Sequence, residues 1–189
     1  VNLDSIMLGF MTSDDNVGYY SAAVKIKQIL VTLVTSLGAV MLPRLAFYYE
    51  QKRFDEFKDL VKNALGFILI VSLPLTIYFT LYAKDAILLL SGESFLASVE
   101  PMQIIMPTVF LIALSNLMGW QILVPMDREK QIVFSTIIGA IVGGIINIFA
   151  IPYLGVNGAA IANLCAECAV VVVQIILLRK FIFPILAKI

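Results

Sequence analysis

Two lysines lie inside an apolar stretch of this sequence, where a charge is costly. Lys25 and Lys27 interrupt the stretch from Val17 to Pro43, which is mostly aliphatic. A lysine at the centre of a membrane span costs about 2.5–3.5 kcal/mol on insertion scales. Such a residue faces a water-filled cavity, snorkels to the interface or pairs with an anion, and the first option would mark a transport path.

The residues around Lys25 form a polar stripe. Polar side chains recur at steps of four and three, at Ser21, Lys25, Gln28, Thr32 and Thr35. This spacing places them on one helical face. Lys27 lies on the neighbouring stripe, which is otherwise apolar. We therefore expect Lys25 and Gln28 to face a hydrated interior and to bind substrate there, and Lys27 to snorkel or pair with another helix. The alternative is that both lysines snorkel to the outer interface.

Two carboxylates also lie in apolar segments. Glu167 falls near the middle of the last long apolar stretch and shares a helical face with Asn163, and Asp4 lies in the first. A carboxylate at that depth must be protonated, paired or exposed to water. Glu167 and Asp4 are therefore candidates for ion coupling. The alternative for Glu167 is a neutral, hydrogen-bonded side chain that holds helices together.

Three asparagines complete the candidate site. Asn116, Asn147 and Asn163 could line a cavity and bind substrate, or hydrogen-bond to other helices. Gly139 and Gly143, which precede Asn147 at steps of four, form a small-xxx-small motif that favours close helix packing.

The composition of the chain shows whether these residues lie in water or in a bilayer. The chain is 61% hydrophobic and 14% charged, against about 45–50% apolar and about 25% charged residues in soluble domains. This composition indicates an integral membrane protein. The net charge of zero suggests no nucleic-acid partner, and the absence of histidine removes the usual general base and the commonest metal ligand. With no nucleotide or metal motif either, we expect no enzymatic activity, no cofactor and no metal.

Apolar segments predict an all-α, polytopic membrane helix bundle. Five segments, each long enough to cross a bilayer, cover approximately residues 16–43, 64–83, 102–125, 131–151 and 156–178. The first 12 residues are apolar but too short to span. We therefore expect about five full transmembrane helices and one truncated helix, in a chain whose upstream part is missing.

The connections between these segments alternate in charge. Residues 44–62, 125–130 and the end of the chain carry basic side chains, whereas 13–15, 84–100 and 152–157 do not carry a basic excess. Basic loops stay in the cytoplasm, so loops 44–62 and 125–130 are predicted to be cytoplasmic. Residues 47–62 are amphipathic and predict a helix lying at the cytoplasmic interface.

Several segments, taken in order, resemble the polysaccharide transporter family of Wzx-type lipid-linked oligosaccharide flippases, within the multidrug/oligosaccharidyl-lipid/polysaccharide superfamily. The resembling segments are Leu3–Gly9 (LDSIMLG), Val17–Ile26 (VGYYSAAVKI), Met41–Leu45 (MLPRL), Gly119–Lys130 (GWQILVPMDREK), Asn147–Pro152 and Gly155–Ala162 (GVNGAAIA).

The resemblance implies one lobe of a two-lobed, alternating-access transporter, with residues 1–189 forming most of its C-terminal lobe and the N-terminal lobe missing. It implies flipping of lipid-linked oligosaccharide or polysaccharide repeat units across the bacterial inner membrane. The implied partners are the bilayer, a lipid-pyrophosphate-linked glycan, the missing lobe and polysaccharide assembly machinery. Lys25 would meet the pyrophosphate as a flexible point charge. Two alternatives stay open: a cation-coupled multidrug exporter of the same superfamily, and a non-transporting membrane scaffold or assembly subunit.

Overall fold

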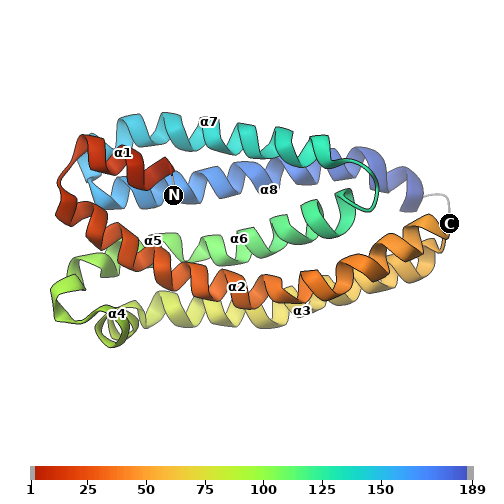
Figure 1. Ribbon diagram of the computed structural model, residues 1–189, viewed down its shortest axis with the longest axis horizontal. Helices are drawn as coiled ribbons and strands as arrows, with labels where there is room; N and C mark the ends of the chain where they lie inside the picture. The colour runs from red at the N-terminus through yellow and green to blue at the C-terminus, as the bar shows by residue number, and fades with distance from the viewer. Residues whose placement is uncertain (1–2, 187–189) are drawn as a thin grey trace.

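The computed structural model describes residues 3–186, whose regular structure is entirely helical. The long helices lie side by side and antiparallel, with α7 and α8 on one side, α2 and α3 on the other and α5–α6 between them (Figure 1). The elements are α1 (Leu3–Met11), α2 (Asp14–Glu50), α3 (Phe54–Leu81), α4 (Ala83–Ser91), the 3₁₀ helix η1 (Glu93–Ser98), α5 (Val99–Ile105), α6 (Pro107–Asn116), the π-helical η2 (Leu117–Leu123), α7 (Glu129–Leu154) and α8 (Val156–Leu186).

The predicted membrane architecture is confirmed. Four helices are long and apolar enough to cross a bilayer, namely α2, α3, α7 and the Val156–Arg179 part of α8. A bent pair is the candidate for a fifth span: Glu93–Ile105 and Pro107–Leu123 meet at 46°. The bend falls at Pro107, which has no amide hydrogen to donate to the preceding turn. The described chain is therefore an all-α polytopic bundle, in which α1, with 9 residues, is too short to cross a bilayer.

The connections gather at two ends of the bundle, as their charges predict. The α2–α3 turn and the η2–α7 turn lie at one end (Figure 1). The α1–α2 turn, the α4 region and the α7–α8 turn lie at the other. The basic connections thus share one end, which we call the basic end.

The prediction of a separate interfacial helix over residues 47–62 is wrong. Helix α2 continues past Pro43 to Glu50, and α3 already begins at Phe54. The chain reverses in a tight turn between them, in which Lys52 has a φ of 56°. The Arg53 amide donates to the carbonyl of Tyr48 and helps to close this turn. The amphipathic segment is therefore the junction of two long helices, and the predicted loop 44–62 is mostly helical.

The α7–α8 hairpin is packed through small residues, as the glycine motif predicts. A Cβ added at Gly139 would lie 2.4 Å from Cγ2 of Val170, and one added at Gly143 would lie 3.0 Å from Cβ of Ala166. Gly155, with a φ of 53°, makes the tight turn between the two helices. This close approach brings polar residues of α7 and α8 within reach of each other and of α1.

Candidate functional site

A buried carboxylate joins four helices at the end of the bundle opposite the basic end. Asp4 lies on α1 and is only 7% exposed. Its Oδ1 accepts a hydrogen bond from Nδ2 of Asn147 on α7 at 2.7 Å. Its Oδ2 accepts from Nδ2 of Asn163 on α8 at 2.8 Å and from the hydroxyl of Tyr20 on α2 at 3.2 Å. One carboxylate therefore ties α1, α2, α7 and α8 together.

Lys27 extends this network with a buried positive charge. Its side chain is 5% exposed, and its Nζ donates to Oδ1 of Asn163 at 3.0 Å. The Asn163 amide thus accepts from an ammonium and donates to a carboxylate, which fixes its orientation. A buried charge is tolerated where it is hydrogen-bonded and attracted by nearby opposite charge, and Lys27 has the Asn163 bond and the attraction of Glu167 and Asp4.

Glu167 adds a second acidic side chain to the group. It lies one turn beyond Asn163 on α8, is half-buried, and interacts electrostatically with Lys27 and Asp4. We call Asp4, Tyr20, Lys27, Asn147, Asn163 and Glu167 the Asp4 cluster. With both acids ionised it carries two negative charges against one positive charge. One bound proton or monovalent cation would neutralise it.

One acceptor in the Asp4 cluster is unused. Oδ1 of Asn147 is buried and has no hydrogen-bond partner, although its Nδ2 binds Asp4. A buried oxygen that lacks a donor loses its hydration without compensation. Oδ1 of Asn147 is therefore a free acceptor close to the Asp4 carboxylate. A proton donor or a cation could bind there.

The α2 polar stripe, made of Ser21, Lys25, Gln28, Thr32 and Thr35, lies outside this network. Lys25 and Gln28 are exposed on α2, and neither side chain forms a hydrogen bond or ion pair with another described residue. The hydroxyls of Thr32 and Thr35 instead donate to carbonyls of α2 itself, at 2.8 Å each. The stripe is therefore largely uncovered within residues 3–186, and the side chains of Lys25 and Gln28 are exposed on it without an internal partner.

Asn116 lies apart from both groups. Its Oδ1 accepts from Nε2 of Gln121 at 3.3 Å, and Gly38 of α2 packs directly against this pair. Side chains five residues apart would diverge by about 140° on an α-helix. They meet here because the π-helical turn η2 holds more residues per turn. The hydrogen bond lies within the α6–η2 segment, and Asn116 meets α2 only through the packing of Gly38.

The structure thus brings together four of the predicted residues: Asp4, Asn147, Asn163 and Glu167. It leaves Lys25 and Gln28 on another surface of α2. The sequence reasoning missed Tyr20 as a member. It expected Lys27 to snorkel or to pair with another helix, and Lys27 contacts Asn163 on α8. The sequence held a signal for both Tyr20 and Lys27, because both lie on the otherwise apolar stripe of α2. An apolar stripe in a bundle is the face that packs on other helices.

Apolar spans that enclose ionisable groups define a multi-pass membrane protein with a polar interior, the class to which helical transporters belong. The model of the family "Lipid II flippase MurJ" matches residues 11–188, and the chain belongs to this family. No solved structure matches the chain.

Curated relatives carry related names. The chain is 28% identical to the "Putative O-antigen transporter" of Escherichia coli K12, over 93% of its own length and 42% of the relative's. It is 26% identical to the "Probable flippase AglR" of Haloferax volcanii, over 86% and 34%. It is 30% identical to the "Probable lipid II flippase MurJ" of Treponema pallidum, over 36% and 13%. The chain spans less than half the length of these relatives.

Proposed function

We propose that this chain is the C-terminal lobe of a two-lobed transporter that flips lipid-linked oligosaccharide or polysaccharide units across the bacterial inner membrane. Family membership over residues 11–188 supports a flippase. The relatives' names favour a glycan carrier over a drug exporter or a scaffold. The protein then moves its substrate by alternating access between two lobes and catalyses no bond change.

The uncovered α2 polar stripe is the observation that carries this proposal. Lys25 lies about 16 Å along α2 from its start at Asp14, so its ammonium is well inside the apolar zone. A lysine and a glutamine facing lipid at that depth would be expensive. A hydrated cavity between this lobe and an N-terminal lobe removes that cost. Lys25 then binds the pyrophosphate, and Gln28 hydrogen-bonds the glycan.

The Asp4 cluster supplies the ion-coupling part of the proposal. Lys27 attracts both Asp4 and Glu167 electrostatically, so loading and release of a cation or proton change the net charge that four helices enclose. Because Asp4 anchors α1, α2, α7 and α8 together, a change in its occupancy would alter how α2 sits against the rest of the lobe. This links the coupling ion to the helix that bears Lys25.

The membrane orientation follows from charge. The basic end, with loops 44–62 and 125–130, faces the cytoplasm. The Asp4 cluster then lies in the outer half of the lobe, and Asn116 and Gln121 lie nearer the inner half. The glycan assembly machinery would act from the cytoplasmic side.

Thiol accessibility tests the cavity. We expect Lys25→Cys and Gln28→Cys to react with a membrane-impermeant maleimide in the full-length protein, after replacement of the native Cys165 and Cys168. Leu30→Cys, on the buried face of α2, and Ile141→Cys, on an exposed apolar face of α7, should stay unreactive.

The controls separate a hydrated cavity from other environments. Leu30 tests burial in protein and Ile141 tests exposure to lipid, while all four cysteines lie inside spans. Labelling of positions 25 and 28 no faster than Ile141→Cys, from either side of the membrane, would contradict a transport path along α2 and favour a scaffold.

A further inference from the structure

An apolar cavity lies at the basic end of the bundle, between α3, η2 and the end of α2. Its volume is about 350 Å³, and its walls include Phe57, Leu65, Ile122 and Met126. Tyr49 closes one side, with its ring centroid 5.9 Å from that of Phe57. The lining is almost wholly apolar, so the cavity suits a hydrocarbon chain rather than a polar solute.

Two lysines border this apolar cavity on one side of α3. Lys58 and Lys62 are four residues apart, so they lie on the same helical face. Lys58 is half-buried and Lys62 is exposed. Neither forms an ion pair or hydrogen bond with another described residue. Asp59 also borders the cavity, which leaves two ammonium groups against one carboxylate.

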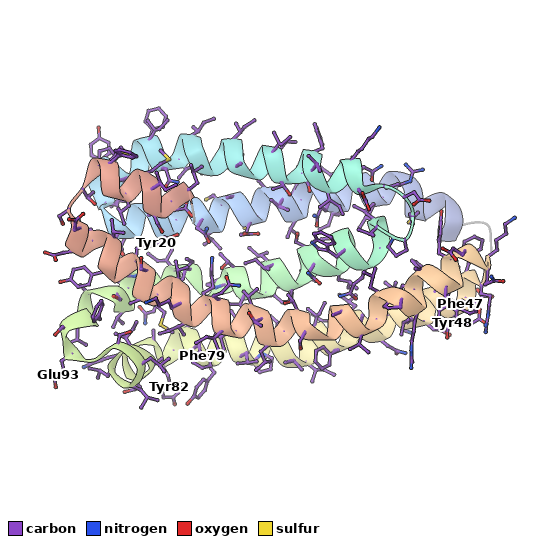
Figure 2. The ribbon with its side chains drawn as sticks, viewed as in Figure 1. Tyr20, Phe47, Tyr48, Phe79, Tyr82 and Glu93 are labelled. Carbon is purple, nitrogen blue, oxygen red and sulfur yellow. The ribbon has the colours of Figure 1, made fainter. Side chains whose placement is uncertain are left out.

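The position of the cavity along α3 sets its depth in the membrane. The sequence holds no charged residue between Lys62 and Lys84. Lys62 therefore marks the boundary at which the apolar span begins, and Lys58 lies one turn outside it. Lysines at such a boundary hold their ammonium groups at the level of lipid headgroups. In Figure 2, Phe47 and Tyr48 are labelled at this same end of the bundle.

We propose that the cavity binds an anionic phospholipid of the adjacent leaflet. One acyl chain occupies the apolar space between α3 and η2, and the lipid phosphate lies between Lys58 and Lys62. A zwitterionic lipid fills the same space less well, because its amine offsets the phosphate that the lysines attract. The bound lipid holds α3 against the π-helical turn. This site is separate from the α2 polar stripe and does not depend on the proposed function.

Lipid selectivity tests this site. Spin-labelled phosphatidylglycerol and phosphatidylcholine are compared for binding to the full-length protein in phosphatidylcholine vesicles. We expect the wild type to prefer phosphatidylglycerol. Lys58→Ala with Lys62→Ala should reduce this preference about thirtyfold, given the attraction of each basic side chain near an anionic surface. Lys58→Arg with Lys62→Arg should retain it.

Two further variants separate the contribution of the two lysines from the contribution of the apolar cavity. Lys52→Ala with Lys130→Ala removes the same charge from the same end but touches neither wall of the cavity, and should leave the preference unchanged. Leu65→Trp should fill the cavity and lower binding of both lipids at this site. An unchanged preference in the Lys58/Lys62 alanine variant would overturn the proposal. Competition by free glycerol phosphate as effective as by the lipid would also overturn it, since the site would then be a simple anion site.

Discussion

Replacing Lys25 by alanine is expected to abolish export of the lipid-linked glycan, and replacing it by arginine is expected to retain part of it. Alanine removes the one free cation of the α2 polar stripe, and truncating a charge that binds a buried anionic partner costs about 2–5 kcal/mol. A loss of at least about thirtyfold in export follows. Arginine keeps the charge but replaces a flexible point charge by a planar fork, which fits a moving phosphate less freely.

The readout is the amount of glycan exported by cells in which the variant is the sole copy. Lys52→Ala is the matched control, because it removes an exposed lysine at the α2–α3 turn and should export like the wild type. Protein levels in the membrane must be equal in all strains. Full export by the Lys25→Ala strain would remove Lys25 from the mechanism.

Asp4→Ala is expected to destabilise the lobe by about 3 kcal/mol. Three donors, from Tyr20, Asn147 and Asn163, lose their acceptor. Each interhelical hydrogen bond in a membrane protein contributes about 0.6 kcal/mol on average. Removing one side of a buried charged network adds the cost of leaving the other side uncompensated, and Lys27 is that other side. The measurement is unfolding of the purified protein in detergent micelles.

Two variants show that this loss comes from the network. Asp15→Ala removes an exposed carboxylate from the first turn of α2 and should cost less than about 1 kcal/mol. Lys27→Met placed on top of Asp4→Ala should restore part of the stability, because the uncompensated ammonium is gone. If Asp4→Ala unfolds like Asp15→Ala, the cluster does not hold the four helices together.

The fold was largely predictable because its solvent is the bilayer. Apolar stretches of fixed length and basic connections are both local signals, and they located the spans and their alternation. The exact ends of the helices were harder to predict. Pro43 suggested an end to α2, yet the helix runs on to Glu50, because a membrane helix can satisfy the groups that a proline frees. The π-helical turn at η2 left no sequence signal.

The candidate site was predictable only in part. Asp4, Asn147, Asn163 and Glu167 were identified because polar side chains in apolar spans are conspicuous. Their meeting could not be predicted, since Asp4 and Asn147 are 143 residues apart and periodicity says nothing about which helices are neighbours. The two lysines illustrate the difference. A pairing of Lys27 with another helix was one of the two outcomes expected from the sequence, but its partner, Asn163 on α8, could not be predicted.

The most direct test of the central claim is a flipping measurement on the full-length protein. The purified protein is reconstituted in vesicles that contain a lipid-linked oligosaccharide, and a lectin outside the vesicles reports glycan that reaches the outer leaflet. We expect wild-type vesicles to expose the glycan far faster than protein-free vesicles, and Lys25→Ala vesicles to match the protein-free rate. Wild-type vesicles that expose the glycan no faster than protein-free ones, under proton and cation gradients of either direction, would contradict the proposal that this lobe belongs to a glycan flippase.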